Sequence, residues 1–107
     1  MYRAPTASSG TSQAPGQYVQ VDLGSARHLN QVVFDTGAST GDFARGYTVT
    51  ASLDGVHWRT FLANGVGSGQ LTTIPMWGLR ERYVRMTLTT ASGSWWSIAD
   101  IRAYGPQ

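Results

Sequence analysis

The sequence has no cysteine, no lysine and a single glutamate in 107 residues, and charged residues make up only 13% of it. The absence of cysteine excludes a disulfide scaffold, a thiolate zinc site and cysteine catalysis. No run of about 18 apolar residues occurs and no charged, then apolar, leader opens the chain, so neither a membrane span nor a signal peptide is expected. The length is that of one domain with a single core.

The positive charge of the chain comes from arginine alone, and the formal net charge is +2. The eight arginines are scattered, and only Arg80, Arg82 and Arg85 lie close together in sequence. Nucleic-acid-binding proteins normally concentrate their cations on one face or in one run. We therefore expect no nucleic-acid partner.

The chain is instead rich in glycine, serine, threonine and tryptophan, which is typical of an all-β module that is secreted or exposed at a surface. Val19, Val21 and Leu23 alternate with polar residues, as in a half-buried strand. The same alternation places Val84, Met86 and Leu88 inward in the segment 82–89, and Val32 and Phe34 share one face of the segment 29–34. No segment shows a helical pattern, and turn signals recur every 8 to 12 residues, which favours a sandwich or a barrel. Strands are expected over residues 18–23, 29–34, 47–52, 58–62, 71–74, 82–89 and 98–104.

Residues 1–16 contain two prolines and many small residues without periodicity. This composition predicts a linker-like or weakly ordered lead-in. Residues 17–107 are then expected to form the domain.

Catalytic constellations are poorly represented. A hydrolase needs a nucleophile with its base, a pair of carboxylates, or a metal cage. Asp35 and Asp42 share one loop, but aspartates in glycine-rich loops usually form turns. His28 and His57 lack partners at metal-ligand spacing. The inventory favours a binding domain over an enzyme.

The tandem Trp95–Trp96 is the sharpest candidate for binding, and residues 92–97 are expected to form a loop around it. Adjacent side chains on extended backbone point to opposite sides, so one indole can fill the core while the other faces solvent. An exposed indole binds apolar faces such as a sugar ring, a lipid edge or a protein. The alternative is that both tryptophans pack inside.

The polar loop from Asp35 to Gly46 is the second candidate. Asp35, Ser39, Asp42 and Arg45 supply acceptors and planar donors that suit vicinal hydroxyls. Phe43 is either an anchor for this loop or another stacking surface. The alternative is a solvated loop in which Asp42 and Arg45 pair with each other.

Four stretches resemble the discoidin, or coagulation-factor type C, domains. They are Tyr18–Gly24, the segment from Tyr47 to Trp58, Arg82–Met86, and the closing run from Trp95 to Gly105. The loop from Gly41 to Tyr47 and the double tryptophan are similar to the bacterial branch, the family 32 carbohydrate-binding modules. The resemblance implies a jelly-roll β-sandwich that binds sugar at one end, with contacts from Asp42, Arg45 and Trp95 or Trp96. It also implies a secreted or extracellular module of a larger bacterial enzyme.

Members of this family usually carry a further N-terminal segment that helps to hold a structural calcium ion. Asp100 matches an acid of that site, but residues 1–16 contain no acidic residue. The resemblance therefore implies an N-terminally shortened sandwich with an incomplete calcium site, and no cofactor is expected. A missing first strand would leave an unpaired sheet edge, which predicts self-association or exchange of the N-terminal segment with a second copy.

The sequence thus predicts a non-catalytic module that binds a polysaccharide or oligosaccharide, of β-glucan or glucosamine type. The candidate ligand-binding residues are Asp35, Ser39, Asp42, Arg45, Trp95 and Trp96. The alternative is a phospholipid- or protein-binding adhesion module of discoidin type, which the absence of cysteine disfavours.

Overall fold

Two long runs of strand-forming residues dominate the fold. In the computed structural model, which describes residues 2–3, 7–59 and 62–105, they form β3 (Tyr18–Asp35) and β6 (Leu71–Leu88). The two strands pair antiparallel, with Tyr18 opposite Thr87 and Asp35 opposite Leu71. Each spans two of the shorter strands that the sequence predicts, so the breaks that those ranges leave at residues 24–28 and 75–81 are wrong.

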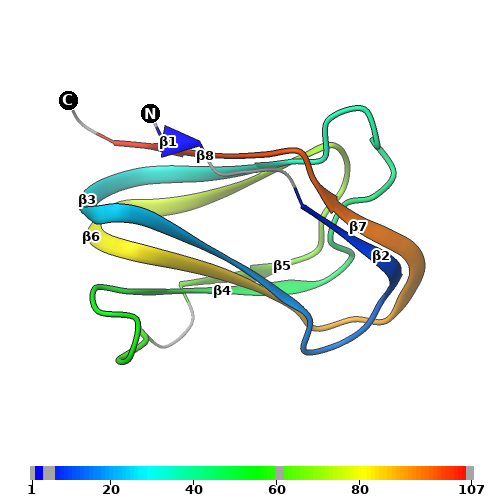
Figure 1. The fold of residues 1–107 in the computed structure, drawn as a ribbon, viewed down its shortest axis with the longest axis horizontal. Coiled ribbons are helices and arrows are strands. Elements are labelled where there is room, and N and C mark those ends of the chain that lie inside the picture. The colour runs from blue at the N-terminus through cyan, green and yellow to red at the C-terminus, as the bar shows by residue number, and fades with distance from the viewer. Residues whose placement is uncertain (1, 4–6, 60–61, 106–107) are drawn as a thin grey trace.

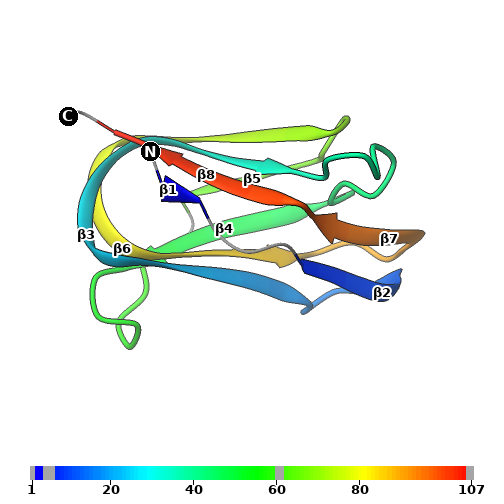
Figure 2. The same ribbon diagram turned by 45° about the horizontal axis from the view of Figure 1, so that its top comes forward.

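The glycine at position 24 produces a bend within β3 where the sequence predicts its end. Gly24 has a φ of 83°, which costs a glycine little. The pairing of β3 with β6 shifts register between Asp22 and Arg27, as at a β-bulge. β3 and β6 both curve round at the end of the molecule that holds this bend. The two halves of each strand therefore lie in opposite layers of a sandwich (Figures 1 and 2).

The remaining strands complete a six-stranded sheet and a two-stranded sheet. The six-stranded sheet has the order β1-β8-β3-β6-β4-β5, and the smaller sheet pairs β2 with β7. These other strands are β1 (Tyr2–Arg3), β2 (Ala7–Gln13), β4 (Tyr47–Ser52), β5 (Ala63–Gly65), β7 (Ser92–Ile98) and β8 (Asp100–Tyr104). The described residues contain no helix, hence none long and apolar enough to cross a membrane. The predicted all-β sandwich is confirmed.

Two further local predictions differ from the structure. Of the predicted strand 58–62, residues 60 and 61 lie outside the described residues, and Trp58 forms an isolated bridge with Ser52 and belongs to no strand. The predicted loop over residues 92–97 is strand β7. A run of Ser, Gly and Trp has no hydrophobic alternation, so its strand character comes from pairing with β2, not from its own pattern.

The predicted lead-in contributes strands to both sheets. Ala7–Gln13 pairs with β7, with Ala7 opposite Ile98 and Gln13 opposite Ser92, and Tyr2–Arg3 pairs with β8. These described parts of residues 1–16 are therefore ordered by backbone pairing, which needs no hydrophobic pattern in the sequence. The boundary of the domain at residue 17 stays a prediction.

The core lies between the two layers and follows the predicted alternation along β6. Val84, Met86 and Leu88 are at most 1% exposed. Val32 and Phe34 of β3 are also buried, as predicted for one face of that strand. Side chains from β3, β4, β6, β7 and β8 complete this cluster, and Trp96 and Ile98 join it from β7.

Candidate functional site

The polar loop between β3 and β4 lies at one end of the sandwich, beside β7 and β2 (Figures 1 and 2). It enters through Gly37, whose φ is 65° and where a Cβ atom would lie 2.6 Å from Cβ of Ala99. Only glycine fits this position without a shift of the backbone. Within the loop, the backbone N–H of Asp42 donates to the carbonyl of Ser39 at 2.9 Å, and Ser39 itself is exposed.

A buried glutamine of β2, Gln13, joins that strand to the loop and to β7 at this end of the sandwich. The side-chain amide of Gln13 donates to the carbonyl of Phe43 at 2.8 Å and to that of Trp95 at 3.2 Å. Its oxygen accepts the backbone N–H of Arg45 at 3.0 Å. Gln13 is 2% exposed, so these bonds are shielded from competing water. Sequence reasoning missed this residue because nothing marks a lone glutamine among small polar residues.

Arg45 is held flat against the loop. Its guanidinium lies 3.6 Å from the centre of the Phe43 ring, and Nη2 donates to the carbonyl of Gly41 at 2.8 Å and to Oγ of Ser94 at 2.9 Å. Phe43 thus acts as an anchor for a cation. The other terminal nitrogen, Nη1, is buried and has no hydrogen-bond partner within the described part of the chain. A polar hydrogen left unsatisfied in this way costs free energy, about 1–3 kcal/mol.

Asp42 fastens the tip of the loop to β7. Its Oδ2 accepts a hydrogen bond from Oγ of Ser97 at 2.7 Å, and its carbonyl accepts the backbone N–H of Ser97 at 3.0 Å. Asp42 and Arg45 therefore each bond to β7, through Ser97 and Ser94. The loop is a structured surface and not a freely solvated one.

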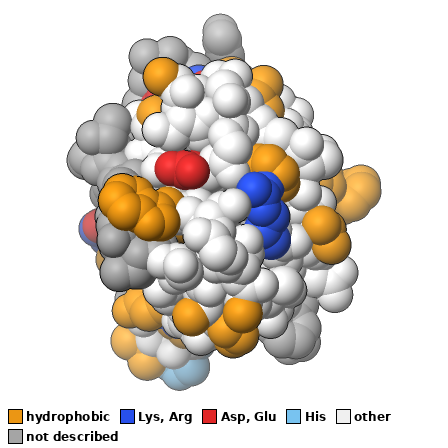
Figure 3. Space-filling view, turned by 90° about the vertical axis from the view of Figure 1, so that its right-hand side faces the viewer, with side chains coloured by type: hydrophobic (Ala, Val, Ile, Leu, Met, Phe, Trp, Pro, Cys, Tyr) orange, Lys and Arg blue, Asp and Glu red, His pale blue; other side chains and the backbone are white. Residues whose placement is uncertain are grey.

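The two adjacent tryptophans of β7 point to opposite sides. Trp95 is 51% exposed, whereas Trp96 is 6% exposed and packs in the core. The predicted alternation is confirmed, and Trp95 is the indole that remains available at this end. Figure 3 looks onto this end, where acidic and basic surfaces lie apart, with uncharged polar surface between them and hydrophobic side chains beside each.

Asp35 sits at the base of the loop and is engaged in structural contacts. Its carboxylate accepts hydrogen bonds from Gly37 N at 2.7 Å, Gln70 Nε2 at 3.0 Å and Arg102 Nη1 at 3.0 Å. The Gln70 bond, followed by that from Gly37, holds the pKa of Asp35 below its ordinary value. This carboxylate is therefore less available to a ligand than the exposed part of the loop.

Asp100, the candidate calcium ligand, shares Arg102 with Asp35. Arg102 Nη1 also donates to Oδ2 of Asp100 at 2.9 Å, and the two aspartates face each other across β3 and β8. The bonds to Asp100 and then to Asp35 raise the pKa of Arg102. Among the described residues no group of three or more His, Asp or Glu side chains is placed to hold a metal ion. A metal role for Asp100 stays a prediction.

Comparison with solved structures finds carbohydrate-binding modules of similar fold. Chitosan-binding module 1 of a chitosanase/glucanase from Paenibacillus sp. IK-5 is 26% identical, over 88% of this chain and 74% of that one, with a TM-score of 0.69. The family 32 module of NanJ from Clostridium perfringens, solved with galactose, is 22% identical over 92% and 73% of the two chains, with a TM-score of 0.72. Another C. perfringens module, solved with GalNAc-β-1,3-galactose, is 22% identical over 87% and 68%, with a TM-score of 0.71.

These likenesses confirm the predicted jelly-roll sandwich. No curated protein matches the sequence. The family description "F5/8 type C domain" matches residues 4–101, which is most of the chain and includes the paired strand β2. The chain therefore belongs to the F5/8 type C, or discoidin, domain family.

Proposed function

We propose that this chain is a non-catalytic carbohydrate-binding module that holds a sugar at the end formed by the loop 36–46 and β7. The observation that carries the proposal is the half-exposed indole of Trp95 beside a loop fixed by hydrogen bonds. The Gln13 amide donates to the carbonyls of both Trp95 and Phe43, so the residue that carries the indole is held close to the loop. Such preorganisation lowers the entropy cost of binding.

The chemistry of this end suits a sugar ring. An indole face offers apolar surface to the C–H face of a pyranose, while polar groups beside the indole form hydrogen bonds with the sugar hydroxyls. Arg45 supplies a planar guanidinium whose buried Nη1 has no partner in the described residues, so a sugar hydroxyl would have to displace neighbouring side chains to reach it. Asp42 supplies a carboxylate that is half-buried and bonded on one oxygen to Ser97.

The ligand we propose is a β-glucan or a glucosamine-type polysaccharide. The Asp42 carboxylate would accept from a hydroxyl or from the ammonium group of an amino sugar, and a charge-assisted bond is roughly twice as strong as a neutral one. The Paenibacillus relative is described as a chitosan-binding module, which supports the amino-sugar arm. The galactose and GalNAc-galactose complexes of the C. perfringens relatives support sugar binding more generally.

The test is calorimetric titration of the Trp95→Ala variant with soluble β-glucan and chitosan oligomers. We expect binding to weaken at least tenfold, which corresponds to about 1.4 kcal/mol. Trp77→Ala is the matched control, because Trp77 is 75% exposed and lies in β6, away from the loop and β7. Equal binding by the wild type and the Trp95→Ala variant would remove the stacking role.

The alternative role, binding of phospholipid or protein, is tested by liposome flotation. Flotation that Trp95→Ala abolishes, together with no response to any glycan, would replace the carbohydrate proposal. Incubation with a polysaccharide panel tests the non-catalytic part, since release of reducing sugar would contradict it.

The relatives suggest where such a module works. The Paenibacillus module derives from a chitosanase/glucanase, and we propose that this chain likewise serves a larger, extracellular bacterial enzyme. Secretion is tested by detecting the parent protein in culture medium.

A further inference from the structure

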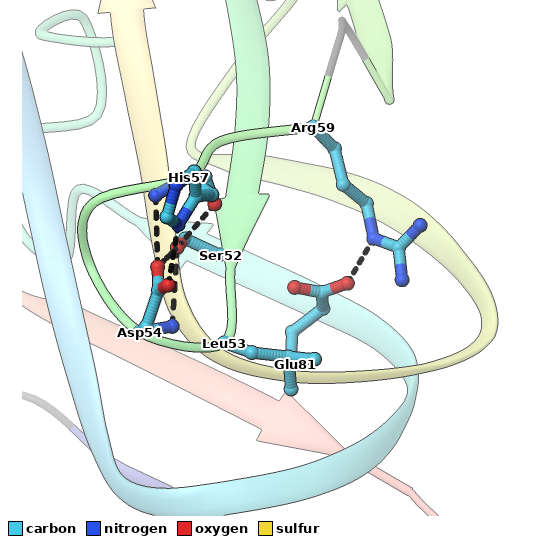
Figure 4. A pocket seen from close by; sticks show the side chains of 6 residues that line it. All are labelled: Ser52, Leu53, Asp54, His57, Arg59 and Glu81. Carbon is cyan, nitrogen blue, oxygen red and sulfur yellow. Dashed lines mark hydrogen bonds and ion pairs between the residues drawn. The ribbon is translucent and has the colours of Figure 1, made fainter.

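A pocket lies at the opposite end of the molecule from the loop 36–46. It is formed where the connection after β4 meets β6, and both ribbon views place that connection at the far end of the long axis (Figures 1 and 2). The pocket has a volume of about 180 Å³. Its lining residues are Ser52, Leu53, Asp54, His57, Arg59 and Glu81 (Figure 4).

The only glutamate of the chain forms part of this pocket. Glu81 is 0% exposed, and its Oε1 pairs with Nε of Arg59. The other oxygen, Oε2, has no hydrogen-bond partner among the residues that the structure describes. Figure 4 shows this oxygen on the side of the carboxylate that faces Ser52, Asp54 and His57. A buried carboxylate oxygen without a donor costs free energy, so it favours any ligand that supplies one.

The second carboxylate of the pocket, that of Asp54, already accepts hydrogen bonds from the turn in which it lies. Oδ1 of Asp54 accepts the backbone N–H groups of Val56 and His57, each at 2.8 Å, and the hydroxyl of Ser52 at 3.1 Å. Oδ2 lies 2.7 Å from Nδ1 of His57. Asp54 therefore contributes negative charge to the pocket wall but little free bonding capacity.

The charges of the lining decide which donor fits. The lining holds two carboxylates, those of Asp54 and Glu81, and one permanent cation, Arg59. The Arg59 side chain is 45% exposed, so solvent weakens its attraction for these carboxylates. When His57 is neutral the lining carries net negative charge. A neutral hydroxyl would satisfy the free oxygen but not this charge, whereas a cationic N–H donor satisfies both.

From this geometry we infer that the pocket is a second ligand site, which binds a primary ammonium group on the free oxygen of Glu81. The ammonium can belong to an amino sugar or to a simple alkylamine. A metal ion fits less well, because hard cations take six or more oxygen ligands and Glu81 offers one free oxygen. The site does not depend on the sugar-binding role proposed for Trp95.

Access to the oxygen requires a side-chain movement. Oε2 is closed off from solvent, and Leu53 and Arg59 line the pocket with side chains that are 46% and 45% exposed. Rotamer changes of exposed side chains are fast, on the ps–ns timescale. Either side chain can therefore move aside when a ligand enters.

The test is an NMR titration of the full chain at constant ionic strength and at a pH above the raised pKa of His57, where the lining carries net negative charge, observing the side-chain carboxyl carbon of Glu81. The probes are methylammonium, glucosamine, N-acetylglucosamine and glucose. We expect saturable shifts with methylammonium and glucosamine and none with the two uncharged sugars. Shifts with glucosamine alone would assign the site to amino sugars. No saturable shift with either ammonium probe, or equal shifts with glucose, would overturn the inference.

Two variants keep the test decisive. Glu81→Gln replaces the free acceptor by a donor of the same shape and should weaken the affinity for the ammonium probes at least tenfold. Because this variant lacks the Glu81 carboxyl carbon, the titration is observed through the NMR signals of His57, which lines the same pocket. Leu53→Trp should block the pocket mouth without touching the carboxylate, and it serves if Glu81→Gln does not fold. Trp95→Ala should leave these shifts unchanged, which separates this site from the proposed sugar site. Unaltered affinity in Leu53→Trp would contradict the assignment.

Discussion

Neighbouring tryptophans of β7 have opposite environments, and this contrast governs what each can do. Trp96 belongs to the core cluster, whereas half of the Trp95 surface meets solvent. Loss of a buried tryptophan removes apolar burial and leaves a cavity. Loss of an exposed one removes mainly surface for a ligand.

We therefore expect Trp96→Ala to lower the free energy of unfolding by about 3–5 kcal/mol. Trp95→Ala should change it by no more than about 0.5 kcal/mol, as for an ordinary surface substitution. Urea denaturation of both variants measures this difference. Equal destabilisation by the two would show that Trp95 is a packing residue.

The Asp54–His57 pair predicts a pH-dependent contribution to stability. The hydrogen bond to Asp54 raises the pKa of His57 above its ordinary 6.5, and that from His57 lowers the pKa of Asp54 below its ordinary 3.8. Stabilisation through His57 is complete below pH 6.5 and is lost as pH rises through the raised pKa. Stabilisation through Asp54 is present above pH 3.8 and is lost as pH falls through the lowered pKa.

An NMR titration should thus find the imidazole of His57 titrating above 6.5. In Asp54→Asn, which retains an acceptor for the turn, it should titrate close to that ordinary value. An unchanged His57 pKa in this variant would assign the shift to another group.

At the level of elements, the loop 36–46 depends on two features that are remote in sequence. One is the close approach of Gly37 to Ala99, between β7 and β8, and the other is the Gln13 side chain from β2. Neither residue can be replaced freely. A side chain at position 37 would collide with Ala99, and a shorter side chain at position 13 would leave the backbone groups that Gln13 bonds without a partner.

Gly37→Ala should destabilise the domain by more than about 1 kcal/mol, because a positive φ and a steric conflict act together. Gly41→Ala is the matched control from the same loop, since a Cβ there meets nothing within 4 Å and its φ is not positive. Thermal unfolding of the two variants provides the comparison. Equal melting temperatures would show that the loop adjusts freely around Ala99.

Gln13→Ala should cost about 1–3 kcal/mol for the part-buried carbonyls and N–H that lose their partner. It should also weaken sugar binding, because Phe43, Arg45 and Trp95 lose their common anchor. Asn64→Ala, an exposed amide in β5, is the control. Chemical denaturation and glycan titration are the measurements, and full affinity in Gln13→Ala would refute the anchoring role.

On the scale of the molecule, the N-terminal residues cover the edges that the sequence predicts to be open. β1 pairs with β8 and β2 pairs with β7 within the same chain. At the other edge of the larger sheet lies β5, which is only three residues long, and short edge strands resist pairing with other chains. Self-association of the full chain stays a prediction.

Removal of residues 1–13 should promote self-association, because it exposes the backbone of β7 and β8. Light scattering of the full and shortened chains at equal concentration measures the effect. A full chain that remains at 11.6 kDa would contradict self-association of the intact protein. A shortened chain that also remains monomeric would show that these edges are protected by other means.

The sequence by itself determined the all-β class, the buried faces of β3 and β6, and the opposition of the two tryptophans. These follow from the period-two alternation of side chains, which is a local property. Only the tertiary structure decided that Trp95 is the exposed indole and that Gln13 anchors the site. It also decided that β3 and β6 each join two predicted strands into one bent strand, and that the N-terminal residues pair with the sheet edges. Each of these depends on backbone groups and side chains that are far apart in sequence, and no local pattern records which of them will meet.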